Sequence, residues 1–146
     1  MASWREYIAS ITADYVLSEP VSARKLNNTE AKLGYRLPNE LRELLQESNG
    51  IYLQRAEWQL ILKIEDLQKD NLHMWRAKWL HSYMPLSNLL FFGAAGNGDL
   101  FAFPISRGGE VKSDVFVWNH EDDSRLCCAP SLRTFLLWWH ERKIRW

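Results

Sequence analysis

The stretch from residue 30 to residue 50 reads EAKLGYRLPNELRELLQESNG and sets out two helices with a turn between them. The first helix is expected from about residue 22 to residue 33. Gly34 suits its C-terminal cap, because glycine adopts the left-handed backbone conformation of that position without steric cost. Pro38 is predicted at the first position of the second helix, where its missing N–H has no partner to lose.

The second helix is predicted to bury one face. Leu41, Leu44 and Leu45 recur at the spacing that aligns side chains along one side of a helix. Asn49-Gly50 is expected to end it. Truncation of Leu44 tests this stripe, because a buried leucine costs much stability when shortened and an exposed one costs almost none.

Upstream, the N-terminal residues predict another amphipathic helix. Ser3 followed by Glu6 is a capping box, in which side chain and backbone of the two residues bond each other at a helix start. Glu19-Pro20 is expected to break this helix. Four large apolar side chains recur at helical spacing after Ser3: Trp4, Ile8, Ile11 and Tyr15.

Downstream of Gly50 the pattern changes to short apolar runs typical of strands. A helix with Leu67, Trp75 and Trp79 facing inward is expected over residues 65–80, and Ser131 is expected to cap a final helix. This order predicts an α+β fold: a mixed, mostly antiparallel sheet flanked by N-terminal helices and a closing C-terminal helix. The predicted strands span residues 58–62, 89–92, 100–103, 111–118 and 126–128.

Length and charge narrow the possible functions. The chain has 146 residues, so we expect a single domain over residues 1–146. Lysine plus arginine and aspartate plus glutamate both number 18, which gives a formal net charge of zero. Dedicated nucleic-acid-binding proteins usually carry a basic excess, so this balance argues against direct nucleic-acid binding. Binding of a protein partner or of a small ligand therefore remains as the possible function.

Nothing in the sequence predicts secretion or membrane insertion. The first residues lack the apolar core of a signal peptide, and the longest apolar stretch, residues 89–96, is too short to span a bilayer. Cys127 and Cys128 are adjacent, and neighbouring strand residues point to opposite faces, so they do not form a disulfide framework. We therefore expect a reduced, soluble, cytoplasmic protein.

No metal, cofactor or catalytic site is expected. No two histidines have the spacing of a helical zinc site, and the cysteines lack metal-ligand spacing. Either cysteine paired with His120 or His140 remains an alternative as nucleophile and base, without a local catalytic signature. At least one of the two thiols is more simply interpreted as a small buried hydrophobe.

The glycine-rich segment GAAGNG, residues 93–98, superficially suggests a phosphate-binding loop. Ala95 stands where the dinucleotide fingerprint requires glycine, and no Gly-Lys-Ser or Gly-Lys-Thr follows. We interpret the segment as a hairpin in which glycines supply positive φ and Asp99 bonds the turn amides.

Aromatic and charged residues supply the binding candidates, since the chain contains eight tryptophans. The acidic run Glu121-Asp122-Asp123 is expected to form either a solvated loop or a contact for a basic partner. Trp138 is rotated about 100° from the apolar face of the last helix, so it is either buried on a second side or exposed. The basic, aromatic segment 142–146 is expected to complement the helix dipole rather than to bind phosphate. The predicted contacts are Trp58, Glu121, Asp122, Asp123 and Trp138.

Two blocks of sequence resemble the SUKH superfamily, most closely its Smi/Knr-type branch. The first is Glu30-x-x-Leu33-Gly34-x-x-Leu37-Pro38-x-x-Leu41-x-x-Leu44-Leu45-x-x-Ser48-Asn49-Gly50. The second is Leu90-Phe91-Phe92-x-x-x-Gly96-Asn97-Gly98-Asp99-x-Phe101. The resemblance covers the chain from about residue 20 onward. The motif positions we interpret as structural are Glu30, Gly34, Leu37, Pro38, Leu41, Asn49, Gly50, Gly96, Asn97, Gly98 and Asp99.

The resemblance implies an α+β fold and a binding function without an active site. Bacterial members are typically immunity proteins that neutralise a polymorphic or contact-dependent toxin, often a nuclease or deaminase, and fungal members regulate cell-wall synthesis as interaction hubs. We expect a bacterial, non-enzymatic immunity protein, because the long extensions of fungal relatives are absent. The alternative is an intracellular scaffold or regulator of endogenous partners. Glu30, Asn49 and Asp99 are expected to fix loops through backbone amides.

Overall fold

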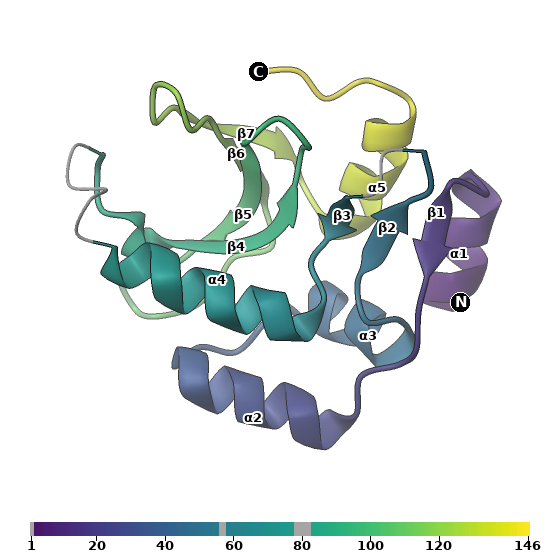
Figure 1. Cartoon of the computed structure of the whole chain (residues 1–146), viewed down its shortest axis with the longest axis horizontal. Coiled ribbons are helices and arrows are strands. Elements are labelled where there is room, and N and C mark those ends of the chain that lie inside the picture. Colours follow the sequence, from purple (N-terminus) through teal and green to yellow (C-terminus); the bar gives the residue numbers. More distant parts are fainter. Residues whose placement is uncertain (1, 56–57, 78–82) are drawn as a thin grey trace.

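The structure is a computed structural model that describes residues 2–55, 58–77 and 83–146 (Figure 1). It confirms the α+β class, with five α-helices and two antiparallel sheets among these residues. In chain order the elements are α1 (Trp4–Ile11), β1 (Tyr15–Leu17), α2 (Ala23–Leu33), α3 (Asn39–Glu47), β2 (Ile51–Leu53), β3 (Gln59–Ile61), α4 (Ile64–Arg76), the 3₁₀ helix η2 (Leu86–Asn88), β4 (Leu89–Ala94), β5 (Leu100–Pro104), β6 (Val115–Trp118), β7 (Arg125–Ala129) and α5 (Leu132–His140).

The two sheets meet between β3 and β4. Their strand orders are β1-β2-β3 and β4-β5-β6-β7. The N–H of Leu62, just after β3, donates to the carbonyl of Phe92 in β4 at 2.8 Å. At Gly93 the two strands come so close that a Cβ would lie 2.2 Å from the Leu60 carbonyl oxygen. Only glycine permits this approach, so the junction between the sheets depends on it.

Helix α4 covers the free edge of β4, beneath the four-stranded sheet in Figure 1. Asn71 of α4 is fully buried, accepts from the Phe91 N–H at 2.7 Å and donates to its carbonyl at 2.8 Å. Trp75 donates its indole N–H to the Leu89 carbonyl at 2.8 Å. Side chains thus satisfy backbone groups that an edge strand would otherwise leave open.

Strand β4 is buried on both faces. On one face Phe92 stacks on Phe103, with centroids 4.2 Å apart, and both belong to the main core with Phe135 of α5. On the other face Phe91 packs edgewise against Trp118 in a smaller cluster. A continuous apolar run suits a strand with two covered faces.

Motif positions of the first block are tied together by polar contacts. Glu30 accepts from the Leu37 N–H at 2.7 Å and pairs with Arg42 at 2.6 Å. Asn49 accepts from the N–H of Ile64 at 2.7 Å, at the start of α4. Gly34 ends α2 with φ +83°. These contacts hold the α2–α3 turn and the α3–α4 junction, as the sequence predicts for Glu30 and Asn49.

The N-terminal prediction is wrong beyond Ile11. Ser3 accepts from the Glu6 N–H at 3.1 Å, so the helix start is confirmed, but α1 ends at Ile11. Tyr15 instead begins β1, where its hydroxyl donates to the Leu136 carbonyl at 2.7 Å. Tertiary pairing with β2 overrides the helical spacing, and a three-residue strand carries too little pattern to be recognised.

Other helix and strand boundaries differ from the predicted ones by a few residues. Pro38 precedes α3 as its N-cap, with φ −55° and ψ 144°, rather than occupying its first turn. Helix α4 ends at Arg76, and the inward position predicted for Trp79 lies outside the described residues. Strand β6 begins at Val115, since Val111 forms only an isolated bridge with the residue after β5.

Candidate functional site

A cleft of about 780 Å³ opens between the chain that follows α5 and the strands of the smaller sheet. We call it the C-terminal cleft. Residues 139, 140, 142 and 144–146 form one side, at the end of α5 and on the chain that runs from it across the top of the molecule in Figure 1. Trp58 and residues 14, 15, 53 and 55 lie on the other. The aromatic side chains of the lining are Tyr15, Trp58, Trp139 and Trp146.

Two of these indoles are fixed by hydrogen bonds. Trp58 donates its N–H to the Ala94 carbonyl at 3.0 Å, and its ring covers Gly96, where a Cβ would lie 2.9 Å from ring carbons. Trp146 donates its N–H to Asp99 at 2.6 Å. The motif glycine therefore does more than adopt positive φ, because its missing side chain makes room for an aromatic wall of the cleft.

Asp99 connects the β4–β5 turn to two other segments. One carboxylate oxygen accepts from the His120 N–H at 3.0 Å and lies 2.6 Å from His120 Nδ1, and the other accepts from Trp146. Burial favours the neutral acid, but these hydrogen bonds hold the pKa of Asp99 below its ordinary value. Asp99 thus bonds an amide of the neighbouring turn, and the expectation that it bonds its own turn is wrong.

The end of α5 is shaped by an arginine in a glycine-like position. Arg142 has φ +59°, and its N–H donates to the Trp139 carbonyl at 3.2 Å. The N–H of Lys143 donates to the Trp138 carbonyl at 2.9 Å. This pair of bonds is the Schellman motif, whose left-handed residue is usually glycine. The turn directs residues 143–146 back over the strand ends, and the basic residues therefore follow the helix rather than lie in it.

Positive charge dominates the C-terminal cleft. Arg55, Arg142 and Arg145 line it, opposite one carboxylate, that of Asp14. Arg55 is 85% exposed and stands 3.9 Å from that carboxylate. Within the described part of the chain, Arg142 and Arg145 have no carboxylate within ion-pair distance. The arrangement suits a ligand that brings negative charge and apolar surface together.

A model of the SUKH_6 family, described as SMI1-KNR4 cell-wall, matches residues 23–136. The chain belongs to this family. The matched region of the SMI1-KNR4 chain contains both sequence blocks and runs from α2 into α5, and it stops short of the segment that forms one side of the C-terminal cleft. No curated protein matches the chain.

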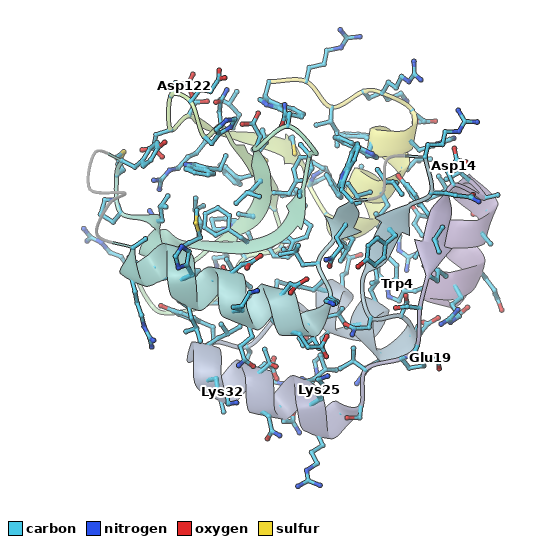
Figure 2. All side chains as sticks on the ribbon, viewed as in Figure 1. Trp4, Asp14, Glu19, Lys25, Lys32 and Asp122 are labelled. Carbon is cyan, nitrogen blue, oxygen red and sulfur yellow. The ribbon has the colours of Figure 1, made fainter. Side chains whose placement is uncertain are left out.

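In this SMI1-KNR4 protein the predicted contact residues are spread over three places. Trp58 lines the C-terminal cleft. Trp138 is half-buried and lines a smaller depression of about 330 Å³ with Cys127, Cys128 and Lys143. The acidic run lies elsewhere, and Figure 2 shows Asp122 well away from Asp14 at the cleft. Residues 144 and 145 separate the two hollows and line both.

The acidic turn, Glu121 to Asp123, is largely used within the protein. Asp123 accepts from Trp118 at 2.7 Å, from the Met84 N–H at 2.8 Å and from Arg125 at 3.0 Å. Burial opposes its ionisation, but these contacts lower its pKa. Asp122 accepts from the Ser124 N–H at 2.9 Å. Glu121 and Asp122 are exposed, so they alone of the turn present carboxylates to solvent.

Sequence reasoning missed the cleft's arginines, Trp139 and Trp146 as a shared surface. The usable signal was the basic, aromatic run 142–146, which the sequence analysis assigned to the helix dipole. Gathering these residues requires the reversal of the chain at Arg142, and nothing in the local sequence announces it, because the residue that usually marks such a turn is glycine.

The two thiols do not form a nucleophile–base pair with the histidines considered. No hydrogen bond joins either thiol to His120 or His140. Burial, with repulsion from Cys127, raises the pKa of Cys128 to about 12. Cys127 is exposed and Cys128 half-buried, so neither is the fully buried hydrophobe that was expected.

The described residues offer neither a metal-binding group nor a membrane-spanning helix. They contain no group of three or more histidine, cysteine, aspartate or glutamate side chains placed to hold a metal ion. Over the same residues, no helix combines the length and apolar character needed to cross a bilayer.

Proposed function

We propose that this SMI1-KNR4 chain is a non-enzymatic, cytoplasmic binding protein that neutralises a cognate toxin domain, and that the C-terminal cleft contributes to the interface. The observation that carries the proposal is the lining of that cleft. Tryptophan, tyrosine and arginine supply most of the binding energy at protein interfaces, and here four aromatic and three arginine side chains share one hollow.

Two features of the cleft support a binding role. Hydrogen bonds fix the indoles of Trp58 and Trp146, so little side-chain entropy remains to be lost on association. The family match ends at residue 136, and the segment that completes the cleft follows it. A rim outside the matched region can carry contacts to one partner without altering the shared scaffold.

Inhibition would be steric. A preformed surface covers the active cleft of the toxin, a nuclease or deaminase domain, with aromatic anchors at the centre and charged groups at the rim. Nucleophilic chemistry at Cys128 is unsupported, because its raised pKa keeps the thiol protonated at neutral pH. Native thiol labelling tests this point, since an activated cysteine reacts before denaturation.

Co-expression tests the proposal directly. The chain is expressed in a heterologous host together with each toxin-like C-terminal domain encoded in its source genome, and host survival is scored. We expect rescue from one domain and a stable complex of the two proteins on size-exclusion chromatography. Rescue from none, with capture of several endogenous regulatory proteins at both low and high salt, would instead support the scaffold alternative.

A further inference from the structure

We infer that the C-terminal cleft receives an acidic segment of the partner protein. Carboxylates of that segment would meet the guanidinium groups of Arg55, Arg142 and Arg145, and an apolar side chain would lie against the indoles of the lining. The inference rests on the proposed function and adds the chemistry of the partner. It follows from charge, backbone conformation and shape.

Arg142 and Arg145 of the cleft differ from the arginines that are paired inside the molecule. Arg42 lies 2.6 Å from Glu30, and Arg125 lies 3.0 Å from Asp123, and all four of these side chains are at most 19% exposed. Arg142 and Arg145 are exposed, and among the residues that the structure describes no carboxylate pairs with either. Guanidinium groups of this kind are available to carboxylates from outside.

The backbone at Arg142 adopts the left-handed conformation. A residue that carries a side chain is strained at φ +59°, whereas glycine adopts this angle without strain. Such strain is retained where the surrounding structure or a function compensates for it. The Schellman turn itself needs only backbone groups and would form with glycine. The arginine side chain is therefore dispensable for the turn, which leaves its charge at the cleft as its contribution.

The charge balance of the chain favours a protein segment over a nucleic acid as the occupant of the cleft. The whole chain has a formal net charge of zero, so it lacks the basic excess that retains a polyphosphate at physiological salt. The carboxylate of Asp14 shares the lining and that of Asp99 lies directly behind Trp146. A peptide with a few carboxylates and apolar side chains matches this mixture of charge and aromatic surface better than a continuous phosphate backbone does.

Fluorescence anisotropy with defined probes tests the inference. The first probe is a labelled peptide of three repeats of Glu-Leu-Glu-Ser, and the second has glutamine in place of every glutamate. A labelled oligothymidylate of equal length is the third. We expect the acidic peptide to bind at least about tenfold more tightly than either of the others, with an affinity that falls as salt is added.

Matched variants locate the binding. The triple variant R55E/R142E/R145E reverses the cleft, and R24E/R36E/R107E makes the same change in net charge at three exposed arginines elsewhere. Only the cleft variant should lose the acidic peptide. R142G removes the charge while relaxing the turn, so we expect weaker peptide binding, by roughly threefold or more, with thermal stability unchanged or raised. Near-ultraviolet circular dichroism verifies that each variant is folded.

Three results would overturn the inference: equal binding of the acidic and glutamine peptides, equal losses in the two triple variants, or tighter binding of the oligothymidylate. None of these bears on toxin rescue. If the wild-type chain rescues the host and the cleft variant rescues it equally well, the immunity function stands and the cleft assignment fails. If no toxin is neutralised but the acidic peptide binds at the cleft, the proposed function fails and the surface chemistry remains.

Discussion

Asp122 of the acidic turn and Asp14 of the C-terminal cleft lie well apart in Figure 2, and the two regions use their charges in opposite ways. In the turn, Asp123 bonds an indole, a backbone amide and a guanidinium of its own chain. In the cleft, Arg142 and Arg145 carry charge with no carboxylate partner among the described residues. A run of like charges in a sequence therefore does not identify an interface, since what matters is which charges remain unpaired after folding.

The largest loss of stability should come from a core residue outside both regions. It is the reference for the losses expected within them. Leu44 of α3 is fully buried in the main core. Leu44→Ala should lower the free energy of unfolding by about 2–5 kcal/mol, through lost burial and the cavity left behind. Denaturant unfolding measures it. A loss below about 0.5 kcal/mol, the size of a surface effect, would contradict the placement of this helix face.

The next largest effect should come from Asp99, where the turn and the cleft meet. Asp99→Ala removes the acceptor of the His120 and Trp146 N–H groups, and leaves them without their protein partner. We expect a loss of about 3 kcal/mol, together with weaker binding at the cleft because Trp146 is released. Asn97→Ala is a comparison in the same turn, since it removes the acceptor of the Asp99 N–H and leaves the Asp99 carboxylate in place. If Asp99→Ala unfolds at the same denaturant concentration as the wild type, the carboxylate does not join the two regions.

Within the acidic turn, neighbouring carboxylates should differ. Asp123→Ala leaves the Trp118 indole N–H and Arg125 without their acceptor, so we expect a loss of about 1–3 kcal/mol. Exposed Asp122 accepts a single local N–H, and Asp122→Ala should change stability by less than about 0.5 kcal/mol. Parallel urea titrations of the two variants measure the difference. Equal losses would mean that the turn acts as one exposed acidic patch.

The helices were predictable because their signals are local. Ser3 and Ser131 each accept from a backbone N–H at the start of their helix, as their sequence positions predict, and Ser22 does the same at the start of α2. Gly34 ends α2 in the left-handed conformation for the same local reason. The hairpin of β4 and β5 was also predictable, since two apolar runs flank a turn rich in glycine and asparagine.

What escaped prediction depends on partners distant in sequence. Strands β1 and β2 are three residues each and exist because they pair with one another. Buried Asn71 looks like an ordinary polar residue of a helix until β4 lies beside it. The C-terminal cleft depends on the reversal at Arg142, and on two indoles whose fixed positions come from the β4–β5 turn. Such surfaces follow from tertiary structure and not from periodicity.

Acid should act on Asp99 and Asp123 together, since hydrogen bonds lower the pKa of each below the ordinary value of 3.8. The unfolded chain therefore binds more protons than the folded one at acidic pH. The stability these carboxylates contribute is complete well above that value and is lost as the pH falls below it, through the lower pKa values of the folded state. Urea unfolding at several pH values should show a flatter acid limb for D99A/D123A. An unchanged slope would mean that other carboxylates dominate.

The smallest expected effect is a change in the rate of association with the partner. Its sign shows whether the partner contacts the C-terminal cleft or the acidic turn. If the partner's acidic segment enters the C-terminal cleft, Glu121 and Asp122 repel it weakly from a distance. The variant E121K/D122K should then bind the neutralised toxin slightly faster at low salt, by no more than a few-fold, with little change in dissociation or stability.

The acidic sequence of the turn also allows direct contact with a basic partner surface, and that alternative gives the opposite sign. A turn in direct contact with basic residues would lose its attraction on charge reversal, so association would slow more than dissociation would change. Stopped-flow association at two salt concentrations decides between them, with R55E/R142E/R145E measured alongside. Slower association of E121K/D122K, with no effect of the arginine variant, would move the interface from the cleft to the turn.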